Sequence, residues 1–313
     1  MRTDLSFKLN KPNQLKLGLA YLLICLIWGS GYPINRIGIT NITPLLFLGG
    51  RLFLAGILTL IYTGWKQRRL PPLREELPKI VIPGLLLFLG GNGLGILGLK
   101  TVSSGPAALL VASAPVFMAL LDLIKPEAPK MNNTGWLGLF IGFGGVVFLM
   151  ITGSEAHVVE WQGACLILGG AACWALGSVY NNRARSKLTA AAQMAGQMMV
   201  GGLALLLLGT VFPGWQGSSF TWPGLAAFGY MLVFDAMIAN CLYLYLLRAW
   251  PSAKVGTYAY ITPFIAGLIG FVFLKEPINF KLISSGIITL AGVFLVQKSY
   301  LKNNGRRSNN VGA

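Results

Sequence analysis

The chain is poor in the side chains from which enzymes build active sites. Of its 313 residues, only nine are Asp or Glu and only one, His157, is a histidine. No carboxylates cluster around His157, so the sequence offers neither a metal-dependent nor a Ser–His hydrolytic centre. It also has no Gly-rich phosphate loop ending in Lys-Ser/Thr, so we expect no ATP-driven chemistry. These absences leave transporters, channels and receptors.

Cysteine is equally scarce. The chain has four cysteines, and no two of them form a CxxC pair or a Cys/His group. All four lie inside apolar runs, where a thiol behaves as a small hydrophobe. The sequence therefore predicts no metal site and no cofactor. The four are Cys25, Cys165, Cys173 and Cys241.

Apolar residues are what the chain has in abundance. They make up 55% of the residues, charged residues make up 11%, and the mean hydropathy is +0.66. This balance is typical of a membrane protein. The net charge of +16 could suggest a nucleic-acid partner. However, the basic residues lie between apolar runs and not on one face, so we expect the lipid bilayer, and no nucleic acid, as a partner.

Ten apolar runs are each near the length of roughly 20 residues that a membrane-spanning helix needs. The connections between them are too short to hold a soluble domain, which argues against a receptor. The sequence therefore predicts an all-α membrane protein with ten transmembrane helices. The runs lie at about 15–36, 44–64, 79–99, 104–124, 133–152, 161–182, 190–211, 222–246, 254–274 and 281–299.

The second half of the chain repeats the first. Trp28, Gly31 and Asn35 recur 146 residues later as Trp174, Gly177 and Asn181, and Asn92 and Pro115 recur 148 residues later as Asn240 and Pro263. Each copy holds five runs, an odd number, so the two copies enter the membrane in opposite senses. Such inverted repeats are typical of secondary transporters, which bind substrate where the halves meet. We expect a cytoplasmic segment at 1–14, one repeat at 15–152, a second at 153–299 and a cytoplasmic tail at 300–313.

The distribution of Lys and Arg predicts the orientation. If the N-terminus is cytoplasmic, 20 of the 25 basic residues fall on the inner side and four fall on the outer side. Because cytoplasmic loops carry the excess of positive charge, we expect both termini in the cytoplasm. The basic loop at 66–79 is expected to rest against anionic lipid headgroups.

Several motifs together resemble the EamA family of the drug/metabolite transporter superfamily. The motifs are the run from Trp28 to Arg36, Pro44 with Arg51, the small-residue helix from Gly105 to Phe117, and Leu274-Lys275-Glu276-Pro277. The resemblance covers about residues 17–298 and both repeats. Asn92 and the run from Trp174 to Tyr180 are most similar to the YedA-like branch of inner-membrane exporters.

The resemblance implies the EamA fold, with a central cavity lined by spans 1, 3, 4, 6, 8 and 9. It also implies export of amino acids, other small metabolites or drug-like compounds across the inner membrane. We therefore expect a secondary active transporter working by alternating access. The alternative is a facilitative channel or uniporter without ion coupling.

Matched polar and helix-breaking residues point to the substrate site. Pro115 and Pro263 break two helices at one depth, which indicates a midplane pocket unless the prolines only bend helices for packing. Asn92 and Asn240 either hydrogen-bond the substrate or tie helices together. Aromatic rings on spans 1, 6 and 9 either line the cavity or pack within the bundle. The candidate substrate-binding residues are Trp28, Tyr32, Asn92, Ser113, Pro115, Trp174, Asn240, Tyr258, Tyr260 and Pro263.

Asp235 lies near the middle of an apolar run, where an ionised Asp costs roughly 2.5–3.5 kcal/mol. The hypothesis is that it binds a cation or proton and couples it to transport. The family more often has a small residue here, so the resemblance does not support this role. The alternative is a carboxyl that is hydrogen-bonded within the bundle or paired with a basic group.

Three other features are expected to be structural. Arg51 is expected to anchor its helix at the outer surface or to pair with a carboxylate, with anion binding as the alternative. The small faces around Gly138 and Gly142 in span 5 and Gly286 in span 10 allow close helix approach. We expect these faces to join the two halves of one molecule, with a dimer interface as the alternative.

Overall fold

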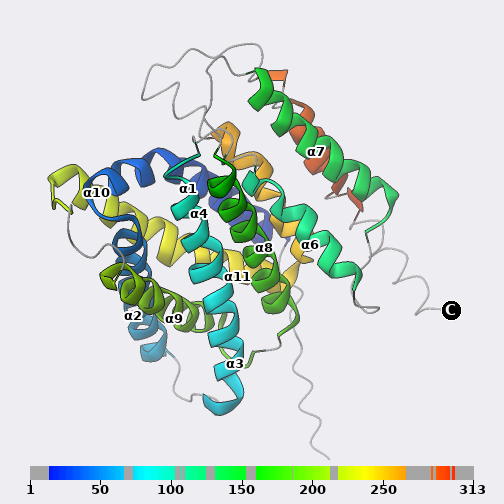
Figure 1. Ribbon diagram of the computed structural model, residues 1–313. Coiled ribbons are helices and arrows are strands. Elements are labelled where there is room, and N and C mark those ends of the chain that lie inside the picture. The colour runs from blue at the N-terminus through cyan, green and yellow to red at the C-terminus, as the bar shows by residue number, and fades with distance from the viewer. Residues whose placement is uncertain are drawn as a thin grey trace, which may run out of the picture.

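The computed structural model describes residues 14–66, 73–102, 107, 110–124, 131–152, 160–184, 186–211, 218–265, 283–284, 287–296 and 298–299 (Figure 1). Throughout this part of the chain the elements are helices. Six helical segments within it are long and apolar enough to cross a membrane: Gln14–Gly31, Pro44–Gly64, Arg74–Gly98, Trp161–Arg183, Ala190–Val211 and Trp222–Ala249. A shorter apolar helix covers Ile287–Val296.

Most helices follow the predicted runs, but the helix Leu73–Gly84 begins six residues before the predicted run at 79–99, so part of the expected loop at 66–79 is helical. Parts of the predicted spans at 104–124, 254–274 and 281–299 lie outside the described residues. The first helix runs five residues beyond its predicted end, and the Asn41 amide donates to the Ile37 carbonyl in its last turn. In chain order the helices are α1 Gln14–Asn41, α2 Pro44–Lys66, α3 Leu73–Gly84, η1 Leu85–Gly93, α4 Leu94–Gly98, α6 Ala114–Leu123, α7 Asn133–Thr152, α8 Trp161–Arg183, α9 Ala190–Val211, α10 Trp222–Tyr230, η2 Met231–Ala239, α11 Asn240–Ala249 and α12 Ser252–Gly256.

The second helices of the two repeats, α2 and α9, pack against each other through glycines. A Cβ on Gly49 would lie 2.8 Å from the Leu206 backbone nitrogen, and one on Gly56 would lie 2.8 Å from the Ala195 carbonyl oxygen. As the residue number rises along α2, the number of its partner on α9 falls, so these helices are antiparallel. Corresponding helices of an inverted repeat are related in this way.

The first helix of each repeat packs against the third span of the other. On one side α8 lies along η1 and α4 (Figure 1), and a Cβ on Gly98 would lie 2.7 Å from the Gly163 carbonyl oxygen. On the other side α1 lies along α10 and η2, and the hydroxyls of Ser30 and Tyr230 are 2.7 Å apart. Each repeat thus packs its first helix against the third span of the other repeat, and a cavity lies between these two helix pairs.

Close approach of small residues also joins α7 to the helix at Ile287–Val296, which run side by side at the edge of the bundle (Figure 1). A Cβ on Gly138 would lie 2.7 Å from the Gly292 carbonyl oxygen, and one on Gly292 would meet the Gly142 backbone. Gly286 lies outside the described residues. The contact is between helices of the two halves of one molecule.

Both third spans contain a π-helix, and the two lie within two residues of equivalent positions by the Asn92–Asn240 offset of 148. The segments η1 and η2 are each nine residues long, and their bounds differ by 146 residues, the repeat offset of the first helices. In η2 the Asn240 backbone N–H donates to the carbonyl of Asp235, five residues back. Wider turns of this kind occur often at functional sites. The sequence analysis did not predict them.

Candidate functional site

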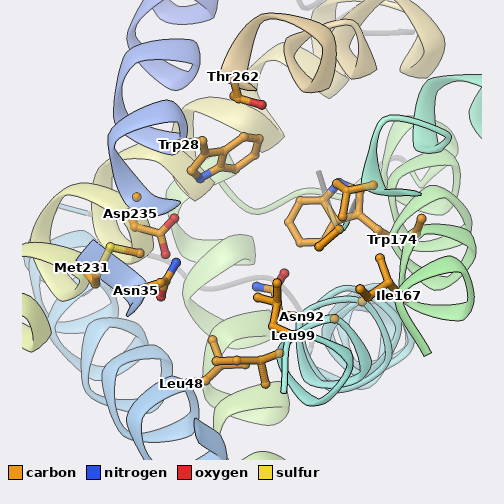
Figure 2. A pocket seen from close by; sticks show the side chains of 18 of the residues that line it. Trp28, Asn35, Leu48, Asn92, Leu99, Ile167, Trp174, Met231, Asp235 and Thr262 are labelled. Carbon is orange, nitrogen blue, oxygen red and sulfur yellow. The ribbon is translucent and has the colours of Figure 1, made fainter. Parts of the chain in front are cut away.

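A cavity of about 440 Å³ lies where the two repeats meet. Figure 2 shows Asp235 and Asn35 on one side of it, with Trp174 and Ile167 across from them. This volume is in the range of sites that hold small organic molecules. The lining combines apolar and aromatic surface with a few polar groups, as binding sites for amphipathic solutes do.

Four rings, which we call the aromatic cluster, pack beside the cavity: Trp28, Trp174, Tyr243 and Tyr258. The Trp28 ring centroid is 4.3 Å from that of Tyr258 and 5.8 Å from that of Trp174. Both pairs have the edge-to-face geometry that aromatic rings favour. Trp28, Trp174 and Tyr258 line the cavity, and Tyr243 is fully buried behind them.

Hydrogen bonds hold the Trp174 ring in place. Its indole nitrogen donates to the Tyr243 hydroxyl at 3.1 Å, and that hydroxyl is 2.6 Å from the Ser178 hydroxyl. Ser178 donates in turn to the Trp174 carbonyl. Because all three residues are buried, this network fixes one wall of the cavity.

A charged cluster of Asn35, Arg51 and Asp235 forms another wall. Arg51 Nη1 donates to Asn35 Oδ1 at 2.8 Å, and Arg51 Nη2 lies 3.4 Å from Asp235 Oδ2. Arg51 is only 4% exposed, yet it lines the cavity, and its guanidinium also lies over the Phe47 ring. The cavity therefore contains an ion pair that is largely removed from water.

The second repeat holds an uncharged counterpart, the amide cluster of Asn181, Gln193 and Gln197. Asn181 Nδ2 donates to Gln197 Oε1 at 3.1 Å, and both glutamines donate to Asn181 Oδ1. Both glutamines also donate to the Lys79 carbonyl of α3. Asn35 and Arg51 are 16 residues apart, and so are Asn181 and Gln197.

Further polar contacts tie the helices together beside the amide cluster. Asn182 Nδ2 donates to the carbonyls of Leu247 and Trp250, and Arg183 pairs with Asp122 at 3.6 Å. Glu76 accepts hydrogen bonds from Ser186 and Lys79. These contacts bind α3, α6, α8 and α11 at the end of the bundle where α8 ends, which we call the sealed end.

The cavity extends toward the end of the bundle that lies opposite the sealed end. Its lining includes Ile39 and Thr40 at the end of α1, and Leu99 and Val102 just after α4. Thr40 is exposed. We call this the open end of the bundle.

The structure places the predicted site residues in two groups. Trp28, Asn92, Trp174, Asn240, Tyr258 and Asp235 line the cavity. Ser113, Pro115, Tyr260 and Pro263 are not among its lining residues, although Ala114 and Thr262 beside the two prolines are. The Tyr32 side chain lies outside the described part of the structure.

The residues that do not line the cavity have packing contacts instead. Tyr260 is fully buried, and a Cβ on Gly142 would lie 2.8 Å from its ring. Pro115 lies against Gly256 of α12. The Ser113 hydroxyl donates to the Leu110 carbonyl.

Two residues of the cavity wall were not among the candidate binding residues. Arg51 was expected to anchor its helix or to pair with a carboxylate, and its ion pair with Asp235 confirms the pairing, whereas Asn35 was noted only as part of the repeat. The structure puts both in the cavity wall with Asp235. The equal spacing of Asn35 to Arg51 and of Asn181 to Gln197 was a signal that could have linked them.

Comparison with known proteins agrees with this architecture. The model of the EamA-like transporter family matches the chain twice, at residues 16–151 and 161–297. The uncharacterized inner membrane transporter YedA of Escherichia coli strain K12 is 34% identical over 286 residues, covering 90% of this chain and 91% of that protein. The uncharacterized transporter YvbV of Bacillus subtilis strain 168 is 27% identical and covers 89% of this chain and 90% of its own. A protein solved by crystallography shares the fold, with a TM-score of 0.74 at 16% identity over 92% of this chain and 98% of its own.

Proposed function

Because the chain belongs to the EamA-like transporter family, it is a multi-pass membrane transporter rather than an enzyme, and we propose that it moves small organic solutes by alternating access. The proposed unit has ten transmembrane helices in two inverted repeats of five. The antiparallel packing of α2 with α9 supports this inversion. Because both repeats lie in one chain, a monomer in the bilayer is a sufficient unit.

One observation carries the proposal. The cavity between the repeats extends toward the open end, while hydrogen bonds and ion pairs tie the helices at the sealed end. This is the geometry expected of one state of an alternating-access transporter. Rocking one repeat against the other would exchange the roles of the two ends.

The orientation predicted from the basic residues places the open end outside and both termini in the cytoplasm. We propose that the protein exports its solute from the cytoplasm. The aromatic cluster and the polar groups of the cavity suit small amphipathic solutes, a class that includes metabolites, amino acids and drug-like compounds.

Cysteine accessibility tests the alternating motion. In a background free of the four native cysteines, Leu99→Cys reports on the open end and Ser252→Cys, which is fully buried, reports on the sealed end. We expect conditions that drive transport to lower labelling at residue 99 and to raise it at residue 252. Labelling at the two positions that never changes in opposite directions would rule out alternating access.

Uptake into proteoliposomes separates the two forms of transport. Accumulation of a solute against its gradient, lost when a protonophore is added, supports a coupled transporter. Equilibration without accumulation supports the alternative, a uniporter or channel.

A further inference from the structure

The guanidinium of Arg51 has hydrogen-bonding capacity that the described residues do not use. An arginine carries five N–H donors in a planar fork. Arg51 Nη1 bonds Asn35, and Nη2 lies at the long distance of 3.4 Å from Asp235. Arg51 Nε is buried and has no hydrogen-bond partner among the described residues. The edge formed by Nε and Nη2, which suits the two oxygens of a carboxylate, is therefore only partly occupied.

The repeat shows that a charge is not needed to tie these helices together. In the second repeat Gln197 occupies the position of Arg51 and bonds Asn181 as Arg51 bonds Asn35. A neutral amide thus makes the same contact between first and second helices. The charge of Arg51, and the carboxylate that neutralises it, require another explanation.

The Arg51–Asp235 ion pair can separate in only one way that leaves no buried charge unpaired. Arginine keeps its proton in proteins, so a solute cation that displaced Arg51 would leave a buried charge unpaired. Asp235 can instead become neutral by taking up a proton, provided that another anion replaces it on Arg51. The described charged side chains on the helices packed against η2 are Lys16, Arg51 and Arg248, and of these only Arg51 forms an ion pair with Asp235.

We propose that the carboxylate of a solute takes the place of Asp235 on the Nε–Nη2 edge of Arg51, and that Asp235 takes up one proton from the water of the cavity. The net charge of the site is then unchanged, and one proton binds with each carboxylate, so export of this pair is driven by the solute's own gradient and not by an inward proton gradient. The apolar part of the solute lies against Trp28, Trp174 and Tyr258. The inference rests on the proposed function and narrows its substrates to amphipathic carboxylates.

Binding to the purified protein tests the inference without requiring transport. The probes are 3-phenylpropionate, its methyl ester and 3-phenylpropylamine, which share one ring and differ in charge. We expect 3-phenylpropionate to bind about 10- to 100-fold more tightly than the ester or the amine. Its affinity should rise from about pH 8 to about pH 6, where the probe itself stays ionised. Calorimetry in two buffers of different ionisation enthalpy should show uptake of one proton per carboxylate.

Paired variants separate this role from a structural one. Arg51→Gln with Asp235→Asn removes both charges and should abolish the preference for the carboxylate over the ester. Asp235→Asn alone should bind 3-phenylpropionate without proton uptake and without pH dependence. The matched control is Arg183→Gln with Asp122→Asn, an Arg–Asp pair that does not line the cavity. It should keep the wild-type preference.

Equal binding of the three probes, tighter binding of the amine, or no binding of 3-phenylpropionate would overturn the inference. So would a carboxylate preference that survives in the double variant. Solute-driven exchange of cysteine accessibility would still support alternating access in those cases. Its loss, with the binding preference intact, would contradict the proposed function instead.

Discussion

The charged cluster at one wall of the cavity and the amide cluster at the sealed end share two equivalent positions of the repeats, Asn35 with Asn181 and Arg51 with Gln197. Asn181, Gln193 and Gln197 are each no more than 1% exposed, and their amides bond one another and a main-chain carbonyl. Arg51 in contrast lines the cavity and keeps one buried N–H without a partner in the part of the chain that the structure describes. In one repeat this position ties helices through a neutral amide, and in the other it carries a charge that is paired with Asp235.

The packing beside the two clusters also differs. At the sealed end Gly84 lets α3 approach α9 so closely that a Cβ would lie 2.8 Å from the Gln197 carbonyl oxygen. The repeat offsets of 146 and 148 place Tyr230 or Leu232, both much larger than glycine, at the equivalent position. Arg51 contacts the side chains of Asn35 and Asp235.

The largest effect on stability is expected for Arg51→Gln, which gives the charged cluster the residue that the amide cluster has at the equivalent position. Arg51→Gln leaves Asp235 buried without its counter-charge, which should lower the free energy of unfolding by about 3–5 kcal/mol at neutral pH. Protonation of Asp235 removes the uncompensated charge, so the loss should shrink as the pH is lowered. Thermal or denaturant unfolding in detergent measures both effects.

The control for this change is the double variant Arg51→Gln with Asp235→Leu, because Leu87 stands at the equivalent position of the first repeat. It should recover most of the lost stability. If the single variant is as stable as the wild type, Arg51 does not compensate Asp235, and the contrast between the clusters disappears.

A smaller effect is expected from Gly84→Ala. The new Cβ would meet the backbone of Gln197, which cannot rotate away, so α3 must move from α9. Overpacking of this kind costs about 1–3 kcal/mol. We expect Ser252→Cys at the sealed end to become more accessible to thiol reagents in this variant. Gly95→Ala is the matched control, since a Cβ there would have no neighbour within 4 Å among the described residues.

Much of this arrangement could be predicted from the sequence. The repeat predicted which helices correspond, and apolar length predicted their bounds, because both features are local or periodic. Asn92, Asn240 and Asp235 were expected to face the interior because polar groups in an apolar run require polar partners or water. All three line the cavity.

The other features of the site could not be predicted because they depend on contacts between residues far apart in the sequence or on details of the backbone. The partner of Asp235 is Arg51, 184 residues earlier in the chain, and only the packing of α2 against η2 brings them together. The π-helical segments replace one hydrogen-bond pattern by another and leave no mark on hydropathy. Tyr258 and Tyr260 are two residues apart, about 200° around a helix, so their side chains point to opposite sides, and Tyr258 is the one that lines the cavity.

The free energy of unfolding is also expected to fall in Tyr243→Phe, which removes the hydroxyl that holds the Trp174 ring in place. The indole N–H and the Ser178 hydroxyl then lose a buried partner, at a cost of about 1–3 kcal/mol. Because Trp174 lines the cavity and Tyr243 does not, probe affinity should fall while the carboxylate preference persists. If the preference disappears as well, the aromatic cluster and the charged cluster act as one site.

The smallest effect on stability is expected for removal of an exposed ion pair at the surface of the sealed end. Lys187 bonds Glu75 at 2.7 Å, but both side chains are more than half exposed. The hydrogen bond and charge of Glu75 raise the pKa of Lys187. A raised pKa means that the pair stabilises the fold while Lys187 is protonated, and that this contribution is lost as the pH rises beyond the ordinary lysine range.

Because water and salt screen an exposed pair, Lys187→Ala should leave the melting temperature unchanged within error near neutral pH. Glu76→Gln, one residue along α3 from Glu75, should lower it clearly, since Glu76 is 1% exposed and accepts hydrogen bonds from Ser186 and Lys187. Equal losses from the two variants would mean that the sealed end is held by surface charge. The contacts that hold the sealed end together would then lie at its periphery and not around the amide cluster.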